Sequence, residues 1–141
     1  MASDDPSAIR SVAVTREDVV TALESNLRSD GRTVLRVTPP FSGRMRARLH
    51  EMGTGEFVGE GDPVHLDPAD LIESVPPYPD PATTEDEIRA AADAEYTTDR
   101  HRERHVEAVE DWRATVRSSL VDSVELPGEE GSRDVTVKAL G

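Results

Sequence analysis

The stretch TVLRVTPPFSGRMRARLH, residues 33–50, contains the signals that decide the fold. Its first six residues are rich in β-branched side chains and alternate in polarity, with Leu35 and Val37 on one face and Arg36 on the other. This pattern predicts a strand over residues 33–38. The double proline that follows cannot continue a central strand or a helix, so we expect the strand to end there.

The second half of the stretch predicts a helix from Gly43 to about Met52. Ser42 can serve as its N-cap, and apolar side chains recur at helical spacing. Those apolar positions are Met45, Leu49 and Met52. The polar face of such a helix would be cationic. It would carry Arg44, Arg46, Arg48 and His50.

These arginines stand out because the chain as a whole is strongly acidic. Its 141 residues include 29 aspartates and glutamates against 16 lysines and arginines, for a formal net charge of -13. Residues 28–50 hold six arginines and one aspartate, whereas residues 51–99 hold 14 acidic residues and one arginine. A basic block therefore borders an acidic half of the chain. Lys138 is the single lysine.

The acidic, lysine-poor composition is similar to that of cytosolic proteins from salt-loving archaea, whose surface carboxylates maintain solubility at high salt. Together with the segment SGRMRARLH, residues 42–50, it resembles an uncharacterised family of small acidic proteins from halophilic archaea with no assigned activity. The resemblance implies a high-salt cytoplasmic setting and explains most of the acidic residues. It carries over no functional residue.

The composition also excludes several classes of protein. The absence of cysteine rules out disulfides, thiol nucleophiles and thiolate zinc sites. The first residues lack the pattern of a secretory signal, and no apolar run approaches the roughly 18 residues of a membrane span. We therefore expect a soluble cytoplasmic protein that makes no contact with a membrane.

The N-terminal half predicts one small domain. Residues 1–11 are polar and are expected to form a flexible tail ahead of an α+β domain over residues 12–75. Within this domain, Thr15 and Asp18 have the spacing of a capping box for a helix over residues 16–29.

Two short apolar segments, residues 56–58 and 64–66, then predict a hairpin around a glycine-containing turn. The segment DPADLIES, residues 67–74, begins with a capping aspartate and a proline, which predicts a helix of one or two turns. The run PPYPDP cannot be helical, so we expect an extended proline-rich connector over residues 76–83.

A C-terminal helical arm is predicted over roughly residues 84–123. Residues 97–105 contain no apolar side chain, which leaves open whether the arm is one helix or two. Alternation over residues 134–140 predicts a terminal strand that returns to pair with residues 33–38, so that residues 84–141 complete the same domain. The predicted fold class is therefore α+β, with a small sheet packed by short helices, a long helical arm and a terminal strand.

The predicted arginine-bearing helix is the first candidate binding site. Free backbone amides at a helix start, together with guanidinium groups, suit phosphate or another anion such as nucleic acid, and a glycine lets the anion approach closely. The residues that would form this site are Arg36, Ser42, Gly43, Arg44, Arg46 and Arg48. The competing interpretation is that these arginines form surface ion pairs with the chain's own acidic residues 51–73.

A second candidate surface lies on the helical arm. Apolar residues recur at steps of three or four, at Val106, Val109, Trp112, Val116 and Leu120. This stripe can pack onto the protein's own sheet. Alternatively, Val109, Trp112 and Val116 bind a partner protein or a second copy of the chain, with Trp112 as the anchor.

The sequence contains no positive signal for catalysis or for a cofactor. His101 and His105 have helical i, i+4 spacing, yet the arginines between and beside them repel a cation, so a solvated helix face is favoured over a metal site. The segment GTGEFVGEG lacks the Lys-Ser/Thr pair of a phosphate-binding loop. A winged helix is incomplete, because residues 39–55 leave room for one helix where two are needed.

Two further histidines, His50 and His65, are isolated in the sequence, and folding alone could bring them to a common site. We therefore expect a non-catalytic binding or adaptor module that contacts an anionic partner through the arginine-bearing helix. The alternative is a protein-protein assembly factor that acts through the helical arm.

Overall fold

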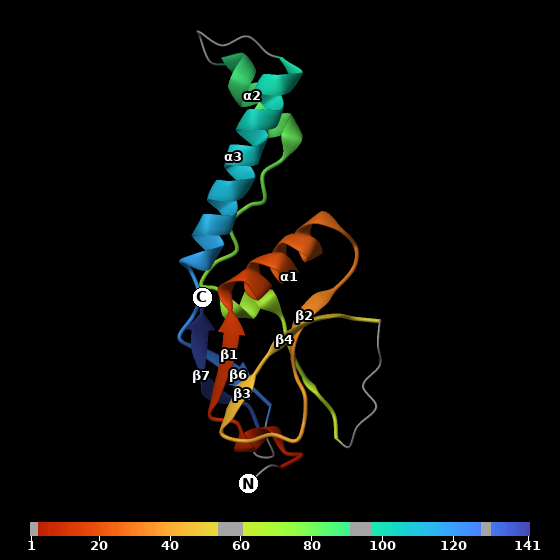
Figure 1. Ribbon diagram of the computed structural model, residues 1–141, viewed down its shortest axis with the longest axis vertical. Helices are drawn as coiled ribbons and strands as arrows, with labels where there is room; N and C mark the ends of the chain where they lie inside the picture. Colours follow the sequence, from red (N-terminus) through yellow and green to blue (C-terminus); the bar gives the residue numbers. More distant parts are fainter. Residues whose placement is uncertain (1–2, 54–60, 91–96, 128–130) are drawn as a thin grey trace.

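The computed structural model describes residues 3–53, 61–90, 97–127 and 131–141. Figure 1 shows an elongated molecule with two small sheets at one end, a pair of helices projecting at the other and a third helix between them. The predicted α+β class is confirmed, including the helical arm and the terminal strand in a sheet. Among the described residues, no helix is long and apolar enough to cross a membrane.

The larger sheet has four strands in the order β3-β1-β7-β6. Its members are β1 (Ser11–Thr15), β3 (Arg44–Arg46), β6 (Ser123–Leu126) and β7 (Arg133–Leu140). β1 runs parallel to both of its neighbours, and β6 pairs antiparallel with β7. Val12 and Val14 of β1 are fully buried, so the residues between them project from the outer face of the sheet.

The smaller sheet has three antiparallel strands in the order β4-β2-β5. Its members are β2 (Thr33–Val37), β4 (Arg48–Glu51) and β5 (Val64–Leu66). The strand predicted over residues 33–38 is confirmed as β2, and residues 64–66 form a strand beside it. The other strand of the expected hairpin, residues 56–58, lies outside the described residues.

The partner predicted for the terminal strand is wrong. Residues 134–140 belong to β7, which pairs with β1 and β6 and not with β2. The sequence SVAVT of β1 alternates in polarity and offers a paired strand five residues long, with Val12 opposite Val137. This strand was not identified from the sequence, and without it β2 was the available partner.

The helix predicted over residues 16–29 is confirmed as α1 (Arg16–Arg28), which contacts β2 and η2 (Pro68–Leu71). The Thr15 hydroxyl caps it by accepting a hydrogen bond from the amide of Asp18 at 3.1 Å. The short helix predicted from Asp67 is the 3-10 helix η2. Buried residues of α1 join the inward side chains of both sheets in a largely aliphatic core. They are Val19, Val20, Ala22 and Leu23.

Residues 3–11 belong to the folded body, so the expectation of a flexible tail is wrong for them. A 3-10 helix, η1 (Pro6–Ala8), precedes β1, and Ile9 is fully buried. The guanidinium of Arg133 on β7 donates hydrogen bonds to the carbonyl oxygens of Ser7 and Ile9. Burial of an apolar side chain and satisfaction of the backbone carbonyls hold the segment against the sheet.

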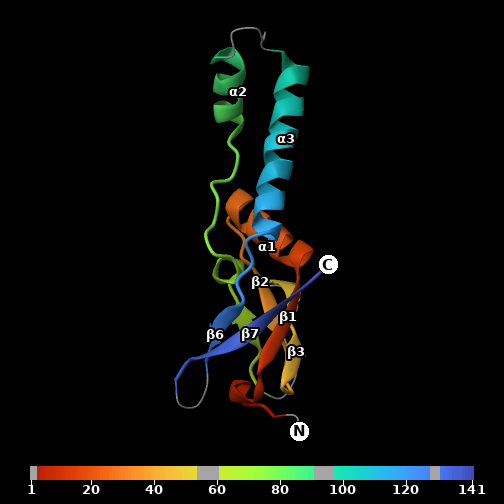
Figure 2. The same cartoon turned by 90° about the vertical axis from the view of Figure 1, so that its left-hand side faces the viewer.

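The helical arm consists of two helices, α2 (Pro81–Ala90) and α3 (Thr98–Arg117), which lie side by side as a hairpin (Figure 2). The Thr97 hydroxyl caps α3 by accepting a hydrogen bond from the amide of Arg100 at 3.0 Å. The proline-rich segment over residues 76–80 forms neither helix nor strand, whereas the last three residues of the connector predicted over residues 76–83 already belong to α2. The arm therefore reaches the core through the base of α3 alone among its described parts, at Trp112 and Val116.

The helix predicted from Gly43 to Met52 is wrong. The chain is extended there and forms β3 and β4, which belong to different sheets. The sequence RMRARLH alternates in polarity with a period of two, as a strand requires, while Met45 and Leu49 also have helical spacing. β1 and β2 offer backbone partners to this segment, and the pairing with them decides in favour of strands.

Candidate anion-binding face

The strongest candidate for a binding surface follows the extended segment of residues 44–50. β3 pairs with β1, β4 pairs with β2, and the fully buried Ala47 joins the two strands. Because side chains alternate along an extended chain, the arginines recur at every second position, roughly 6.6 Å apart. These residues, Arg44, Arg46 and Arg48, are all exposed, and we call them the arginine strand.

The first half of the arginine strand borders the outer face of the larger sheet. Arg44 lies opposite Ser11 of β1, and Arg46 lies opposite Ala13. Ala13 lies opposite Lys138 of β7 on its other side. Since laterally paired residues project from the same face, Arg46 and Lys138 flank a small side chain there. The sequence analysis did not identify Lys138 as a site residue, because its position relative to β3 depends on the pairing of both strands with β1.

The second half lies on the smaller sheet beside two histidines. Arg36 of β2 is the cross-strand partner of Arg48 on one side and of His65 on the other. Its Nη1 lies 3.4 Å from Nε2 of His50. The imidazole rings of His50 and His65 are stacked, with centroids 5.8 Å apart and planes 12° from parallel. The strand order thus brings together residues that are far apart in the sequence. We call Arg36, Arg48, His50 and His65 the histidine face.

The histidine face is electropositive. Partial desolvation lowers the pKa of the exposed His65 side chain, and the neighbouring His50, Arg36 and Arg32 lower it further. Strand alternation places Glu51, paired with Thr33, on the opposite face of the sheet. His65 is therefore neutral at pH 7 and can gain a positive charge if an anion arrives.

Carboxylates do not neutralise the arginine strand within the part of the chain that the structure describes. The ion pairs found there involve α1, α2 and α3. They join Arg89 to Glu85, Arg113 to Glu24 and Glu110, and Arg117 to Glu17. The interpretation that these arginines form ion pairs with the chain's own acidic residues is therefore unsupported over the described residues. The acidic residues at positions 56 and 60 lie outside them.

Ser42 and Gly43 do not have the positions predicted for them, because no helix begins there. The Ser42 hydroxyl donates to the carbonyl oxygen of Arg44 at 3.2 Å. The Gly43 carbonyl oxygen accepts hydrogen bonds from the amides of Arg10 and Ser11, both at 2.9 Å. Both residues therefore fix the start of β3. The anion site predicted at a helix N-terminus is wrong, although the arginines that follow remain exposed.

The predicted partner-binding residues of the arm lie largely inside the protein. Trp112 is 4% exposed, and its indole Nε1 donates to the carbonyl oxygen of Pro76 at 2.9 Å. Its ring packs edge-on against Tyr78 with centroids 5.0 Å apart, and Val116 is fully buried. Trp112 is therefore a core residue and not an exposed anchor, because the lower half of the stripe docks onto the body.

Apolar side chains remain exposed higher on the same helix. Val106 is 55% exposed, and Leu27 at the end of α1 is 46% exposed. Together with Val109 they line a groove of about 450 Å³ between α1 and the base of the arm.

His101 and His105 contribute to the hairpin of α2 and α3. Nε2 of His101 lies 2.8 Å from the carbonyl oxygen of Pro81, an acceptor, so this nitrogen must donate a proton. Nδ1 of His105 lies 3.2 Å from the hydroxyl oxygen of Thr84, which is buried. Among the described residues, no group of three or more potential metal ligands comes together.

The chain belongs to a family whose model, described as domain of unknown function DUF8009, matches residues 1–141. No curated protein and no solved structure matches the chain. Its function must therefore be argued from the geometry of the surface.

Proposed function

We propose that this protein is a non-catalytic binding or adaptor module that contacts an anionic partner, with nucleic acid favoured, through the arginine strand. One observation supports this above all others. In a chain with a net charge of -13, three neighbouring arginines are exposed and have no carboxylate partner among the described residues. A planar guanidinium can donate two parallel hydrogen bonds to one phosphate, which suits a partner with regularly repeated phosphates.

The proposed setting is the high-salt cytoplasm of a halophilic archaeon. The acidic, lysine-poor composition supports it. At 1 M salt the Debye length is about 3 Å, so long-range attraction contributes little and direct contacts must provide the affinity. Arginine meets this demand better than lysine, because its donors have a fixed geometry.

Neutralising the arginine strand tests the proposal. We expect Arg44→Gln, Arg46→Gln and Arg48→Gln combined to weaken binding of a labelled single-stranded oligonucleotide at least tenfold in fluorescence anisotropy. The slope of log K against log salt should also become shallower, by about 0.7 for each phosphate that the protein no longer neutralises. Because the three side chains are exposed, the melting temperature should change little.

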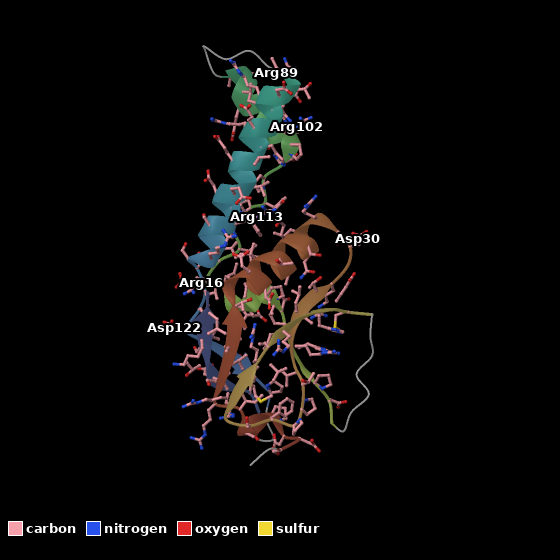
Figure 3. The ribbon with its side chains drawn as sticks, in the orientation of Figure 1. Arg16, Asp30, Arg89, Arg102, Arg113 and Asp122 are labelled. Carbon is pink, nitrogen blue, oxygen red and sulfur yellow. The ribbon has the colours of Figure 1, made fainter. Side chains whose placement is uncertain are left out.

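The matched control removes the same number of charges from the arm, with Arg89, Arg102 and Arg104 changed to glutamine. Figure 3 shows Arg89 and Arg102 near the tip of the helical hairpin, far from the sheets. This control should bind like the wild type. Equal weakening by both triple variants would mean that charge alone matters, and undiminished binding by the arginine-strand variant would refute the proposal.

The alternative function is protein-protein assembly through the helical arm. The exposure of Val106 and Leu27 beside the groove favours it, since exposed aliphatic side chains that share a groove suit a partner's apolar surface. Trp112 and Val116 contribute to this alternative only indirectly, by fixing the base of the arm.

A further inference from the structure

The histidine face offers chemistry that the arginine strand lacks. Arg36 and Arg48 carry fixed positive charges, whereas the imidazole of His65, stacked on that of His50, can gain charge by taking up a proton. The four side chains come from three adjacent strands and project from one face of the smaller sheet. Such a surface can adjust its charge to the ligand that it meets.

The contact with Arg36 sets the hydrogen-bonding role of His50 on this face. Arginine can only donate, so the 3.4 Å contact assigns Nε2 of His50 as the acceptor and leaves the proton of the neutral ring on Nδ1. The fixed charges that act on His65 among the described residues are those of Arg36 on β2 and of Arg32, which precedes β2. A metal ion would be repelled by these neighbours, whereas an anion would be attracted.

We propose that the histidine face binds the dianion of a phosphate monoester and takes up a proton as it does so. The inference rests on the proposed function and adds to it a ligand group and a site. A monoester has a second pKa near 6 and carries close to two negative charges at neutral pH. An internal phosphodiester carries one charge, which matches a single arginine of the arginine strand. The continuity of β3 and β4 through Ala47 places both kinds of contact along one segment of chain.

Proton uptake follows from the electrostatics of the face. Without a ligand, partial desolvation and the neighbouring guanidinium groups of Arg36 and Arg32 lower the pKa of His65, which is therefore neutral at pH 7. A bound dianion reverses the local field and favours the charged imidazolium, so the pKa of His65 rises on binding. The affinity should therefore increase as the pH falls from about 8 toward 6, and the gain should stop where the phosphate itself becomes protonated.

Isothermal titration calorimetry with methyl phosphate tests this inference. Titrations at pH 7.5 in two buffers of different ionisation enthalpy give the number of protons taken up, because methyl phosphate is already a dianion there. We expect uptake of a measurable fraction of a proton for the wild type. Dimethyl phosphate, a monoanion, should bind at least fivefold more weakly and without uptake. Absence of methyl phosphate binding, or binding without uptake, would overturn the proposal.

Two variants keep the test specific. His50→Gln with His65→Gln retains polar side chains, and we expect it to abolish proton uptake and weaken methyl phosphate binding at least fivefold. Arg102→Gln with Arg104→Gln changes α3 on the helical arm, away from both sheets, and should leave methyl phosphate binding unaltered. Full proton uptake by the double histidine variant would overturn the proposal. Thermal melting of each variant checks that the fold is retained.

Oligonucleotides with and without a terminal phosphate distinguish the source of the monoester and separate this inference from the proposed function. A gain in affinity from the terminal phosphate that depends on His50 and His65 would identify a strand end as the ligand. Methyl phosphate binding without such a gain would identify a small phosphorylated molecule. Binding of the unphosphorylated strand that depends on the arginine strand, with no response to methyl phosphate, would support the proposed function and refute this inference.

Discussion

Glu24 ties the helical arm to the body of the protein. It lies on α1, is 9% exposed and accepts three hydrogen bonds from two side chains. Nε and Nη2 of Arg113 lie 2.9 and 3.0 Å from its carboxylate oxygens, and the Tyr78 hydroxyl lies 2.6 Å away. Burial acts to raise the pKa of Glu24, but these hydrogen bonds outweigh burial and hold the pKa below its ordinary value of 4.5.

Replacing Glu24 by glutamine should lower the free energy of unfolding by about 2 kcal/mol at pH 7, because it removes charge-assisted hydrogen bonds. A carboxylate with a lowered pKa stabilises the fold above its unfolded-state pKa and loses that contribution as the pH falls through its folded-state pKa. The difference between the wild type and Glu24→Gln should therefore shrink below about pH 4.5. Urea unfolding from pH 7 to pH 3 measures it.

The matched control is Glu110→Gln, which removes the exposed partner of the same arginine. It should lower the free energy of unfolding by less than about 1 kcal/mol, since exposed ion pairs contribute little. A difference in the free energy of unfolding between the wild type and Glu24→Gln that stays constant with pH would contradict the assigned charge state of Glu24.

At the scale of elements, the helices and strands that could be predicted are those marked by a local sequence pattern. Thr15 marks the start of α1, and alternation marks β2 and β7. The segment over residues 44–50 satisfied two periodicities at once, and its choice between them depended on β1 and β2, which are distant in the chain. β1 has a clear alternation of its own, so its omission was avoidable from the sequence.

In the candidate site, too, only the features that a local pattern encodes were predictable from the sequence. The exposed position of the arginines was predictable from their charge, but their backbone conformation was not. Strand order and register place three further residues near these arginines: His50, His65 and Lys138. Register depends on pairing between segments far apart in the sequence, and a local pattern does not encode it.

The arm provides an element-scale prediction, because one helix carries both a core residue and an exposed one. Trp112→Ala should lower the free energy of unfolding by about 3–5 kcal/mol, since it removes a large buried side chain. Val106→Asp should change it by less than about 0.5 kcal/mol, since Val106 is exposed. Urea unfolding measures both, and equal losses would contradict the docking of α3 at its base.

The variant Val106→Asp also tests assembly through the arm. If the arm binds a second copy, size-exclusion chromatography with light scattering should find a wild-type dimer that Val106→Asp dissociates without unfolding. A wild-type monomer at about 0.1 mM would exclude self-assembly and leave a different protein as the partner of this surface.

At the scale of the whole molecule, charge repulsion is the main electrostatic feature. The net charge of -13 is spread over 141 residues, and the ion pairs among the described residues are mostly exposed. Exposed pairs contribute little attraction, whereas the repulsion among carboxylates acts over the entire surface. Added salt therefore removes more repulsion than attraction, and the partly buried pair of Glu24 and Arg113 is screened least.

This balance predicts that the melting temperature rises with salt. Between 0.1 M and 2 M KCl we expect a gain of roughly 1–2 kcal/mol, or about 5 °C for a domain of this size. The variant Asp86→Asn with Glu87→Gln removes two exposed negative charges from α2 and should melt higher than the wild type at low salt, with a smaller response to KCl. Circular dichroism melting curves of both proteins across the KCl series measure the effect. If both respond equally, the gain comes from the general action of salt on apolar burial, and charge repulsion is not what limits the stability of this molecule.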